Sequence, residues 1–492
     1  MPNATGSKAH GIEPDGIDAT GARTIAIVGG GFTGAAVALH LAAAAHPGGR
    51  RIVVFEPRAK PGAGLAYDTR EPTHRINVPA GNMSLYPDDP ESFLRYAEER
   101  VTPATDPDAG NAAGQLFPQR SVFGDYVAHE LAPHLASGAV EHRRALVTAI
   151  VRRGRGWQVE TESGALLHAD IVVIAVSHPA PALPRVLAGL AGHGGLIPEG
   201  ARTEKLDTIR RDDRVLIVGN GLTAADVIAT LDRRGHKGPI LAISRRGLRS
   251  QGHARVVQDP YGDFVSPAPE ERASQLLRRI RATLREAAAQ GIGWHAVFDA
   301  VRKQGQDIWR ALPVAERRRL IRHLRPYWDV HRFRIAPQVE QVLDRAIAEG
   351  RLTILAASLR DACADADGIH VTLRRKGRAG TVEKVVDAVV VTTGPAHGGI
   401  LDSQPFLRRQ RDDGHLRLCD SGLGIACDRR SRALDAAGAP QDDLFIAGPL
   451  ARGTFGELMG LPQVSEHALA VAGEVAAVLA AAGDDPAPRS GA

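Results

Sequence analysis

The amino-acid sequence predicts an α/β fold with two domains, one inserted in the other, and an additional helical insertion. An apolar run that leads into closely spaced glycines and a small-residue helix occurs twice, at residues 24–38 and 215–226. Further apolar runs at residues 171–176, 388–391 and 444–446 are typical of buried parallel strands. A chain of 492 residues is also too long for one ordinary core, which favours several domains.

The first glycine turn has the spacing of a dinucleotide-binding site. Gly29, Gly31 and Gly34 follow the predicted strand, and a helix of small residues comes next. Such glycines allow a tight turn, close approach of a pyrophosphate and contact between helix and strand. Glu56 ends the next strand, residues 51–55, where a carboxylate can accept hydrogen bonds from ribose hydroxyls. An ordinary strand-to-helix turn is the alternative.

Loops rich in Gly, Asn and Pro follow at residues 57–90 and contain Asn77. Beside a nucleotide site, such loops favour an ordered lining for a long cofactor, although plain surface loops are the alternative. The apolar run at residues 171–176 then ends in His178, a candidate proton donor. A histidine that only makes hydrogen bonds within a turn is the simpler interpretation of His178.

The second glycine turn differs from the first at two points. Gly219, Gly221 and Ala224 give GxGxxA, in which alanine replaces the third glycine, and helix–strand packing tolerates this change. The next strand, residues 240–243, ends in Ser244 followed by Arg245 and Arg246 instead of an acid. A hydroxyl and two cations suit a 2′-phosphate, which predicts NADPH in preference to NADH. Solvated turn arginines are the alternative.

Residues 263–337 read as a helical insertion that contains three of the four tryptophans, Trp294, Trp309 and Trp328. Aromatic and basic side chains here can cap a cleft and bind a planar, anionic substrate. Packing aromatics and solvated arginines explain the same composition. His331 and Arg334 are weak catalytic candidates in this region, and the sequence does not identify a catalytic acid or base.

The C-terminal part predicts a strand that ends in Gly448 and Pro449, followed by a long alanine-rich helix at residues 464–482. The N-terminus of that helix would stabilise a reduced, anionic flavin ring. The longest apolar stretch, residues 468–482, includes Glu474 and is shorter than a membrane span, so we expect no membrane partner.

Charge and cysteine content argue against several classes of partner and site. The net charge is +5, from 61 basic and 56 acidic residues, which is small for this length and does not indicate a nucleic-acid partner. The three cysteines form no CxxC or metal-type cluster, so we expect no metal site and a cytoplasmic setting.

The chain resembles the two-dinucleotide-binding-domain flavoproteins, which include disulfide reductases and the Baeyer–Villiger and N-hydroxylating monooxygenases. It is most similar to a bacterial FAD/NAD(P)-binding family that includes an FAD-dependent urate hydroxylase. The segments that carry this resemblance are residues 25–38, 76–96, 215–226, 244–247, 322–337 and 445–468.

The resemblance implies that FAD binds at Gly29, Gly31, Gly34 and Glu56. It places the nicotinamide nucleotide at Gly219, Gly221, Ala224 and Arg245, with the flavin ring near Gly448 and Pro449. The missing CxxC excludes disulfide reductase chemistry, and the Baeyer–Villiger fingerprint FxGxxxHxxxW is also missing.

Together these features predict an FAD-dependent monooxygenase that uses NADPH, or NADH, and molecular oxygen to hydroxylate a small, planar heterocycle such as urate. An NAD(P)H:acceptor flavin reductase and a non-catalytic FAD-binding sensor are the alternatives. The predicted organisation is two Rossmann-like dinucleotide-binding domains. The boundaries are a disordered leader (1–22), the FAD domain (23–200 and 401–483), the NAD(P)H domain (201–262 and 338–400), the helical insertion (263–337) and a tail (484–492).

Overall fold

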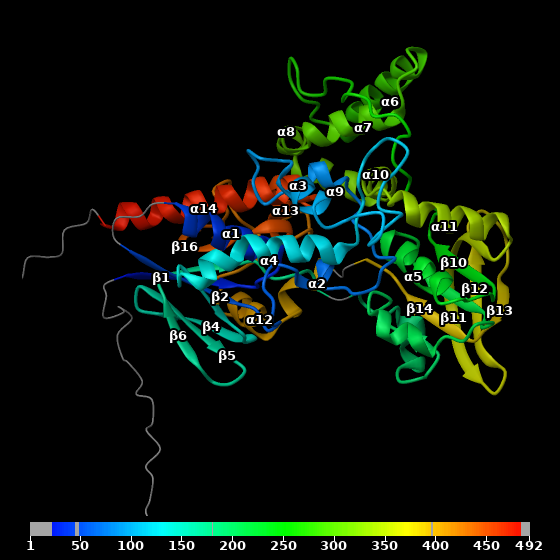
Figure 1. The fold of residues 1–492 in the computed structure, drawn as a ribbon, viewed down its shortest axis with the longest axis horizontal. Helices are drawn as coiled ribbons and strands as arrows, with labels where there is room; N and C mark the ends of the chain where they lie inside the picture. Colours follow the sequence, from blue (N-terminus) through cyan, green and yellow to red (C-terminus); the bar gives the residue numbers. More distant parts are fainter. Residues whose placement is uncertain (1–21, 45–48, 180, 395–396, 484–492) are drawn as a thin grey trace, which may run out of the picture.

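The computed structural model describes residues 22–44, 49–179, 181–394 and 397–483. Apart from residue 22, the leader and the tail expected at the two ends of the chain lie outside the described residues. The predicted α/β fold is confirmed: two large sheets carry helices, and a third, three-stranded sheet packs beside the first (Figure 1).

The first sheet has six strands in the order β15, β16, β7, β1, β2 and β3. Strands β16, β7, β1, β2 and β3 are parallel, whereas β15 pairs antiparallel with β16. Val28 pairs with both Phe55 and Ile174, so the residues that follow β1, β2 and β7 meet at one edge. The strands are β1 (Arg23–Val28), β2 (Arg50–Phe55), β3 (Val140–Arg143), β7 (Ile171–Ile174), β15 (Arg432–Leu434) and β16 (Pro440–Ile446).

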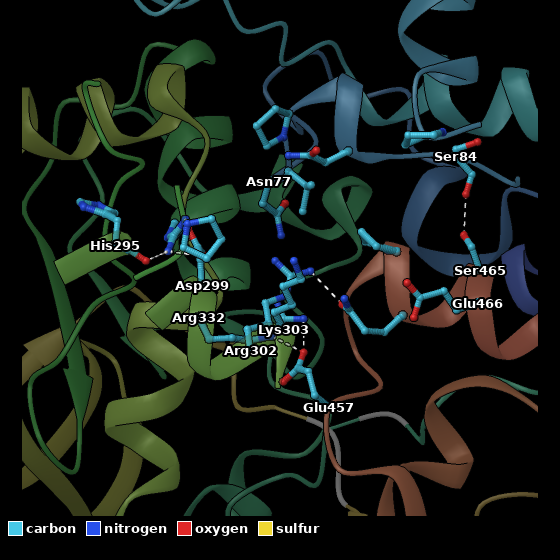
Figure 2. Close-up of a pocket in the computed structure, with 18 of the residues that line it drawn as sticks. Asn77, Ser84, His295, Asp299, Arg302, Lys303, Arg332, Glu457, Ser465 and Glu466 are labelled. Atoms are coloured by element: carbon cyan, nitrogen blue, oxygen red, sulfur yellow. Dashed lines mark hydrogen bonds and ion pairs between the residues drawn. The ribbon is translucent and has the colours of Figure 1, made fainter. Parts of the chain in front are cut away.

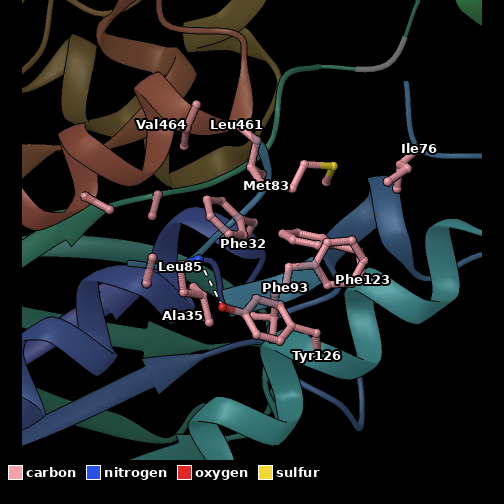
Figure 3. Packing of buried hydrophobic residues seen from close by; sticks show 14 of the residues in the cluster. Phe32, Ala35, Ile76, Met83, Leu85, Phe93, Phe123, Tyr126, Leu461 and Val464 are labelled. Carbon is pink, nitrogen blue, oxygen red and sulfur yellow. Dashed lines mark hydrogen bonds between the residues drawn. The ribbon is translucent and has the colours of Figure 1, made fainter. Parts of the chain in front are cut away.

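Three helices build the core on one face of this sheet: α1 (Phe32–Ala43), α4 (Arg120–Ala136) and α14 (Leu461–Gly483). Small residues along α1 let α14 pack closely against it. The aromatic part of the core lies beside α1 and α4 and includes Phe32, Phe93, Phe123 and Tyr126 (Figure 3). Short elements complete this face: α2 (Gly64–Tyr67), η1 (Ala80–Asn82) and α3 (Ser92–Glu98).

The opposite face of the first sheet is covered by a small antiparallel sheet and one helix. Trp157 and Phe406 are buried there in a second apolar cluster. The elements are β4 (Val147–Arg153), β5 (Gly156–Thr161), β6 (Leu166–Ala169) and α12 (Pro405–Asp412).

The second sheet has seven strands in the order β13, β12, β11, β10, β9, β14 and β8. Its helices are α5 (Leu222–Arg233) and α11 (Pro337–Ala348). β8 pairs with β14, so this sheet already includes residues that precede the boundary expected at residue 200. The strands are β8 (Leu196–Ile197), β9 (Val215–Val218), β10 (Ile240–Ser244), β11 (Leu352–Asp365), β12 (Gly368–Arg375), β13 (Val382–Val386) and β14 (Ala388–Val391).

All strands of the second sheet lie between β7 and β15 in the sequence, so the chain leaves the first sheet, builds the second and returns. Five of the helices between β10 and β11, those that precede α11, form the insertion, which is built around a separate cluster that includes Phe264, Leu276, Val297 and Leu312. Figure 1 shows α6, α7 and α8 projecting from the body of the molecule. The helices are α6 (Ala273–Ala289), α7 (Trp294–Lys303), α8 (Gly305–Ala311), α9 (Val314–His323) and α10 (Arg325–Arg332).

Short helices η2 (Arg185–Leu190), η3 (Thr203–Thr208), η4 (His397–Asp402), η5 (Gly448–Ala451) and α13 (Arg452–Phe455) connect the larger elements. α14 begins at Leu461, three residues before the expected start. Within the described residues, one segment of α14, Leu461–Ala481, is long and apolar enough to cross a membrane by length and composition. Its face that includes Val464, Ala468, Val471 and Val475 is buried in the core with α1.

Candidate functional site

The first glycine turn leaves the N-terminus of α1 open. Gly29 has a φ of 101°, and a side chain there would come within 2.7 Å of the carbonyl oxygen of Ala175. A side chain at Gly34 would overlap the carbonyl of Gly29, because helix and strand touch here. Gly31 is the N-cap of α1, and in the described structure no side chain caps it. The first-turn N–H groups are therefore available to an anionic ligand.

Glu56 follows β2 and is 4% exposed. One carboxylate oxygen accepts a hydrogen bond from the Gly30 N–H at 3.1 Å. The other accepts from the backbone N–H and the guanidinium of Arg58, at 3.1 and 3.0 Å. These bonds fix the carboxylate at the sheet edge beside the glycine turn. Oε2, which accepts only the Gly30 bond among the described residues, has a second lone pair, so Glu56 can also accept a hydrogen bond from a ribose hydroxyl.

A cavity of about 540 Å³, the inner cavity, opens at this edge. Its walls include the first glycine turn, the ends of β2 and β7, the first turn of α5 and the loop after β16, together with α2, the start of α4 and the segment before β4. The lining includes Gly29, Gly31, Glu56, Ala175, His178, Thr223, Asp226 and Pro449. The two glycine turns thus belong to different sheets, yet the first turn and the start of the helix after the second turn share one cavity.

Gly448 lies against α1 and is fixed from behind by a buried histidine. It has a φ of 68°, and a side chain there would crowd Thr33. The Gly448 N–H donates to Nδ1 of His467 at 3.1 Å, so Nε2 of His467 carries the proton and donates to Ser431 at 2.9 Å. Burial lowers the pKa of His467 to about 4, which keeps the ring neutral. His467 could not be identified from the sequence, because only its contact with Gly448 in the folded chain indicates its role.

The second glycine turn has the same backbone as the first. Gly219 has a φ of 117°, and a side chain there would lie 2.6 Å from the carbonyl oxygen of Thr392. Gly221 is the N-cap of α5, and no described atom lies within 4 Å of the place where its side chain would project. Ala224 is fully buried, and it takes the place of the third glycine. A phosphate can approach Gly221 without obstruction.

The two arginines after β10 point to different places. Arg245 lines a cavity of about 650 Å³ together with Arg360, Arg374, Arg375, Lys376 and Arg378 of β11, β12 and the turn that follows β12. Arg246 instead stacks its guanidinium on the ring of Tyr327 in α10, 5.3 Å from the ring centroid. The structure therefore separates the pair that the sequence placed together.

Asn77 belongs to a larger cavity of about 830 Å³, the outer cleft, which Figure 2 shows. The cleft lies between the loops that follow β2, the helical insertion and the start of α14. The outer cleft and the inner cavity adjoin near Arg120, which lines the inner cavity. Arg120 pairs with Asp226 at 2.9 Å and donates to the side-chain oxygen of Asn77 at 3.4 Å. His253 donates from Nε2 to the Asn77 carbonyl at 3.0 Å and lines the outer cleft.

The three weak catalytic candidates lie in different surroundings. His178 lines the inner cavity, and burial, followed by the charges of Arg452 and Arg325, lowers its pKa to about 4. It is neutral at pH 7 and is therefore a poor proton donor there. Arg334 lines the outer cleft and pairs with Asp299 at 2.8 Å.

His331 packs between the rings of Trp294 and Phe298, with centroids 4.9 and 4.7 Å away, and Nδ1 lies 2.7 Å from the Tyr327 carbonyl oxygen. The described lining of the inner cavity and the outer cleft does not include it. These contacts give His331 a packing role.

The tryptophans of the insertion do not line the outer cleft in the described structure. Trp309 donates from Nε1 to the Gly453 carbonyl at 2.9 Å, and Trp294 stacks on His295. The packing alternative therefore describes them better than a platform for a planar substrate. Among the residues that the structure describes, no group of three His, Cys, Asp or Glu side chains is placed to hold a metal ion.

Comparisons with known proteins agree with this geometry. A family model described as FAD-NAD(P)-binding matches residues 26–179, which include the first glycine turn, Glu56, Asn77 and His178. No curated protein sequence matches the chain.

Solved structures match nearly the whole chain. An ornithine hydroxylase from Pseudomonas aeruginosa matches with a TM-score of 0.63 and 18% identity over 93% of this chain and 100% of that one. L-lysine 6-monooxygenase from Pseudomonas syringae matches with a TM-score of 0.62 and 21% identity, over 93% of this chain and 99% of that one. An ornithine N-hydroxylase from Kutzneria, with reduced FAD, NADP⁺ and L-ornithine, matches with a TM-score of 0.58 and 17% identity, over 94% of this chain and 100% of that one. The shared property is the fold.

Proposed function

We propose that the protein is an FAD-dependent, NADPH-using monooxygenase that hydroxylates a small substrate in the outer cleft, with molecular oxygen as co-substrate. One observation carries this proposal. The inner cavity is lined both by the first glycine turn and by the first turn of α5, so the two nucleotide sites converge. Convergence of a flavin site and a nicotinamide site is what hydride transfer between them requires.

The residues around the inner cavity fit FAD. Gly29, Gly31 and Gly34 leave room for a pyrophosphate at the N-terminus of α1, and Glu56 can accept hydrogen bonds from the ribose. Gly448 and Pro449 would lie beside the flavin ring, positioned by His467. When bound, FAD supplies hydride acceptance from the nicotinamide and reaction with oxygen.

We propose NADPH as the hydride donor, bound at Gly219, Gly221 and Ala224, with NADH as the weaker substitute. Arg245 supports this choice because it lies among five further cations that suit a 2′-phosphate. We propose the domain boundaries given above, with one change: the NAD(P)H domain also includes β8, because β8 pairs with β14 of the second sheet. A cytoplasmic setting is supported by the free cysteines Cys363, Cys419 and Cys427.

We further propose an aliphatic amine as the substrate in place of urate or another planar heterocycle. The solved structures reported above are named for ornithine and lysine. The insertion tryptophans are engaged in packing, which removes the aromatic platform on which the heterocycle hypothesis depended. The exposed carboxylate of Glu466 lines the cleft and can pair with an amine, whereas Asp299 and Asp307 line it but already pair with Arg334 and Arg310.

The test is NADPH oxidation by the FAD-loaded protein in the presence of L-ornithine, L-lysine, cadaverine and urate, with oxygen uptake and hydroxylated product measured together. Stimulation by an amine with matching product supports the proposal. Turnover with quinones or dyes but without hydroxylated product would identify an acceptor reductase. Bound FAD without NADPH oxidation would identify a sensor protein.

A further inference from the structure

Two arginines from different helices of the insertion meet at one corner of the outer cleft. Arg302 lies in the last turn of α7, and Arg332 is the last residue of α10. The terminal nitrogens of both guanidinium groups crowd the position that a side chain at Gly460 would occupy, as does the amide oxygen of Gln463. A glycine at residue 460 therefore allows the two cations to lie next to each other. We call Arg302, Arg332, Glu457 and Gln463 the arginine corner (Figure 2).

The arginine corner holds more positive than negative charge. Glu457 pairs with Arg332, and both side chains are buried. Arg302 donates to the neutral side chain of Gln463 at 2.9 Å, and its Nε is buried without a hydrogen-bond partner among the described residues. The described ion pairs give Arg302 no carboxylate partner, although exposed Glu466 lines the same cleft.

Nearby charges do not remove this surplus. Arg334 and Asp299 neutralise each other at 2.8 Å. Arg452, buried at the start of α13, has an Nε without a hydrogen-bond partner in the described residues. Its charge acts on both Arg332 and Glu457, and the neighbouring charges of Arg325 and Asp329 offset each other. Burial and the neighbouring Arg332 lower the pKa of Arg302 to about 10, so its guanidinium stays charged at pH 7. Keeping this charge buried beside a second cation costs free energy. A bound anion would offset that cost.

We propose that the arginine corner binds a carboxylate of the substrate between Arg302 and Arg332, so that the substrate of the outer cleft is an amino acid or another small organic acid. The proposal rests on the proposed function, because it assigns the substrate to this cleft. Guanidinium groups present parallel N–H donors that match a carboxylate. The other cationic cavity, around Arg245, is assigned to the nucleotide phosphate, which leaves this corner for a different anion.

The test is calorimetric titration of the FAD-loaded protein with glutarate, inorganic phosphate and NADP⁺ as separate probes. Glutarate should bind the wild-type protein, and Arg302→Gln should weaken that binding by about tenfold or more, since a charged hydrogen-bonding partner is lost. Lys303→Gln is the matched control, because Lys303 is exposed on the same cleft outside the corner. It should change glutarate binding less than twofold.

Two further variants keep the test independent of folding. Glu457→Gln removes the only carboxylate of the corner and should strengthen glutarate binding. Gly460→Ala keeps every charge but displaces the guanidinium groups, and should weaken it. Absence of glutarate binding, or equal binding by wild type and Arg302→Gln, would overturn the proposal.

Binding of only phosphate or NADP⁺ that depends on Arg302 would also overturn it, because the corner would then serve the nucleotide. These titrations need no turnover. A failed monooxygenase assay with intact, Arg302-dependent glutarate binding would therefore count against the proposed function alone.

Discussion

The two glycine turns have the same backbone but opposite charge at the position that follows the next strand. In each, a glycine with positive φ presses on the neighbouring strand end, and an N-cap glycine leaves the helix N-terminus without a side-chain cap in the described structure. After β2 the chain places the buried carboxylate of Glu56, whereas after β10 it places the exposed cation of Arg245. Under the proposed assignment, each turn accommodates a dinucleotide, and the residue after the following strand distinguishes FAD from NADPH.

The third small residue of the motif, Gly34 in one turn and Ala224 in the other, gives the largest predicted difference in the free energy of unfolding. Gly34→Ala would place a side chain on the Gly29 carbonyl, whereas Ala224 already carries a side chain at the equivalent place. We expect Gly34→Ala to destabilise the protein by about 3 kcal/mol or more, and Ala224→Gly by about 1 kcal/mol. Urea unfolding followed by circular dichroism measures both. Similar losses from the two variants would mean that the turns do not differ in packing.

Substitution of the second glycine, Gly31 or Gly221, should affect FAD binding in one turn and NADPH binding in the other. Gly31→Val should yield colourless protein, because its side chain would occupy the place proposed for the pyrophosphate of FAD. Gly221→Val should retain FAD, since Gly221 lies in the other turn, and lose NADPH-dependent reduction of the flavin. Flavin absorbance after FAD reconstitution and rapid-mixing reduction with NADPH measure the two effects. FAD retained by Gly31→Val would contradict the assignment.

A buried histidine behind Gly448 makes the first site sensitive to acid. Unfolded histidine takes up a proton below pH 6.5, but burial lowers the pKa of His467 in the folded protein to about 4. The stabilisation is therefore complete above pH 6.5 and is lost as the pH falls towards 4. Between pH 7 and pH 5 we expect His467 to account for about 2 kcal/mol of lost stability.

His467→Gln keeps a donor and an acceptor for Ser431 and Gly448 but does not titrate. Its stability should fall less than that of the wild type between pH 7 and pH 5, as measured by urea unfolding at both values. Equal falls would show that His467 does not titrate on unfolding in this range.

The smallest predicted effect concerns the choice of nicotinamide nucleotide. Arg245→Ala should raise the KM for NADPH about tenfold and leave the KM for NADH nearly unchanged, because one charge-assisted hydrogen bond to the 2′-phosphate is lost. Arg246→Ala is the matched control, since Arg246 stacks on Tyr327. Equal effects of Arg245→Ala on both nucleotides, or equal effects of the two variants, would contradict the 2′-phosphate assignment.

Local features were predictable from the sequence, and distant contacts were not. The glycine turns and the strands before them depend on neighbouring residues, so spacing alone located them. Arg246 could not be separated from Arg245 in this way, because its stacking partner Tyr327 belongs to the insertion. The arginine corner combines Arg302, Arg332 and Glu457, which come from three separate segments, and no sequence pattern joins them.

The sequence could not decide between substrate binding and packing for the insertion tryptophans, for a related reason. Aromatic residues near arginines are typical both of ligand sites and of helix packing, and only the tertiary structure decides between them. Trp309 donates to the Gly453 carbonyl and is buried, so its ring is not available to a substrate.

The insertion of the second sheet between β7 and β15 means that the chain passes between the sheets twice. Each half of the molecule is therefore joined to the other at two places in the sequence. A single proteolytic cut in either connection would therefore leave the two halves joined.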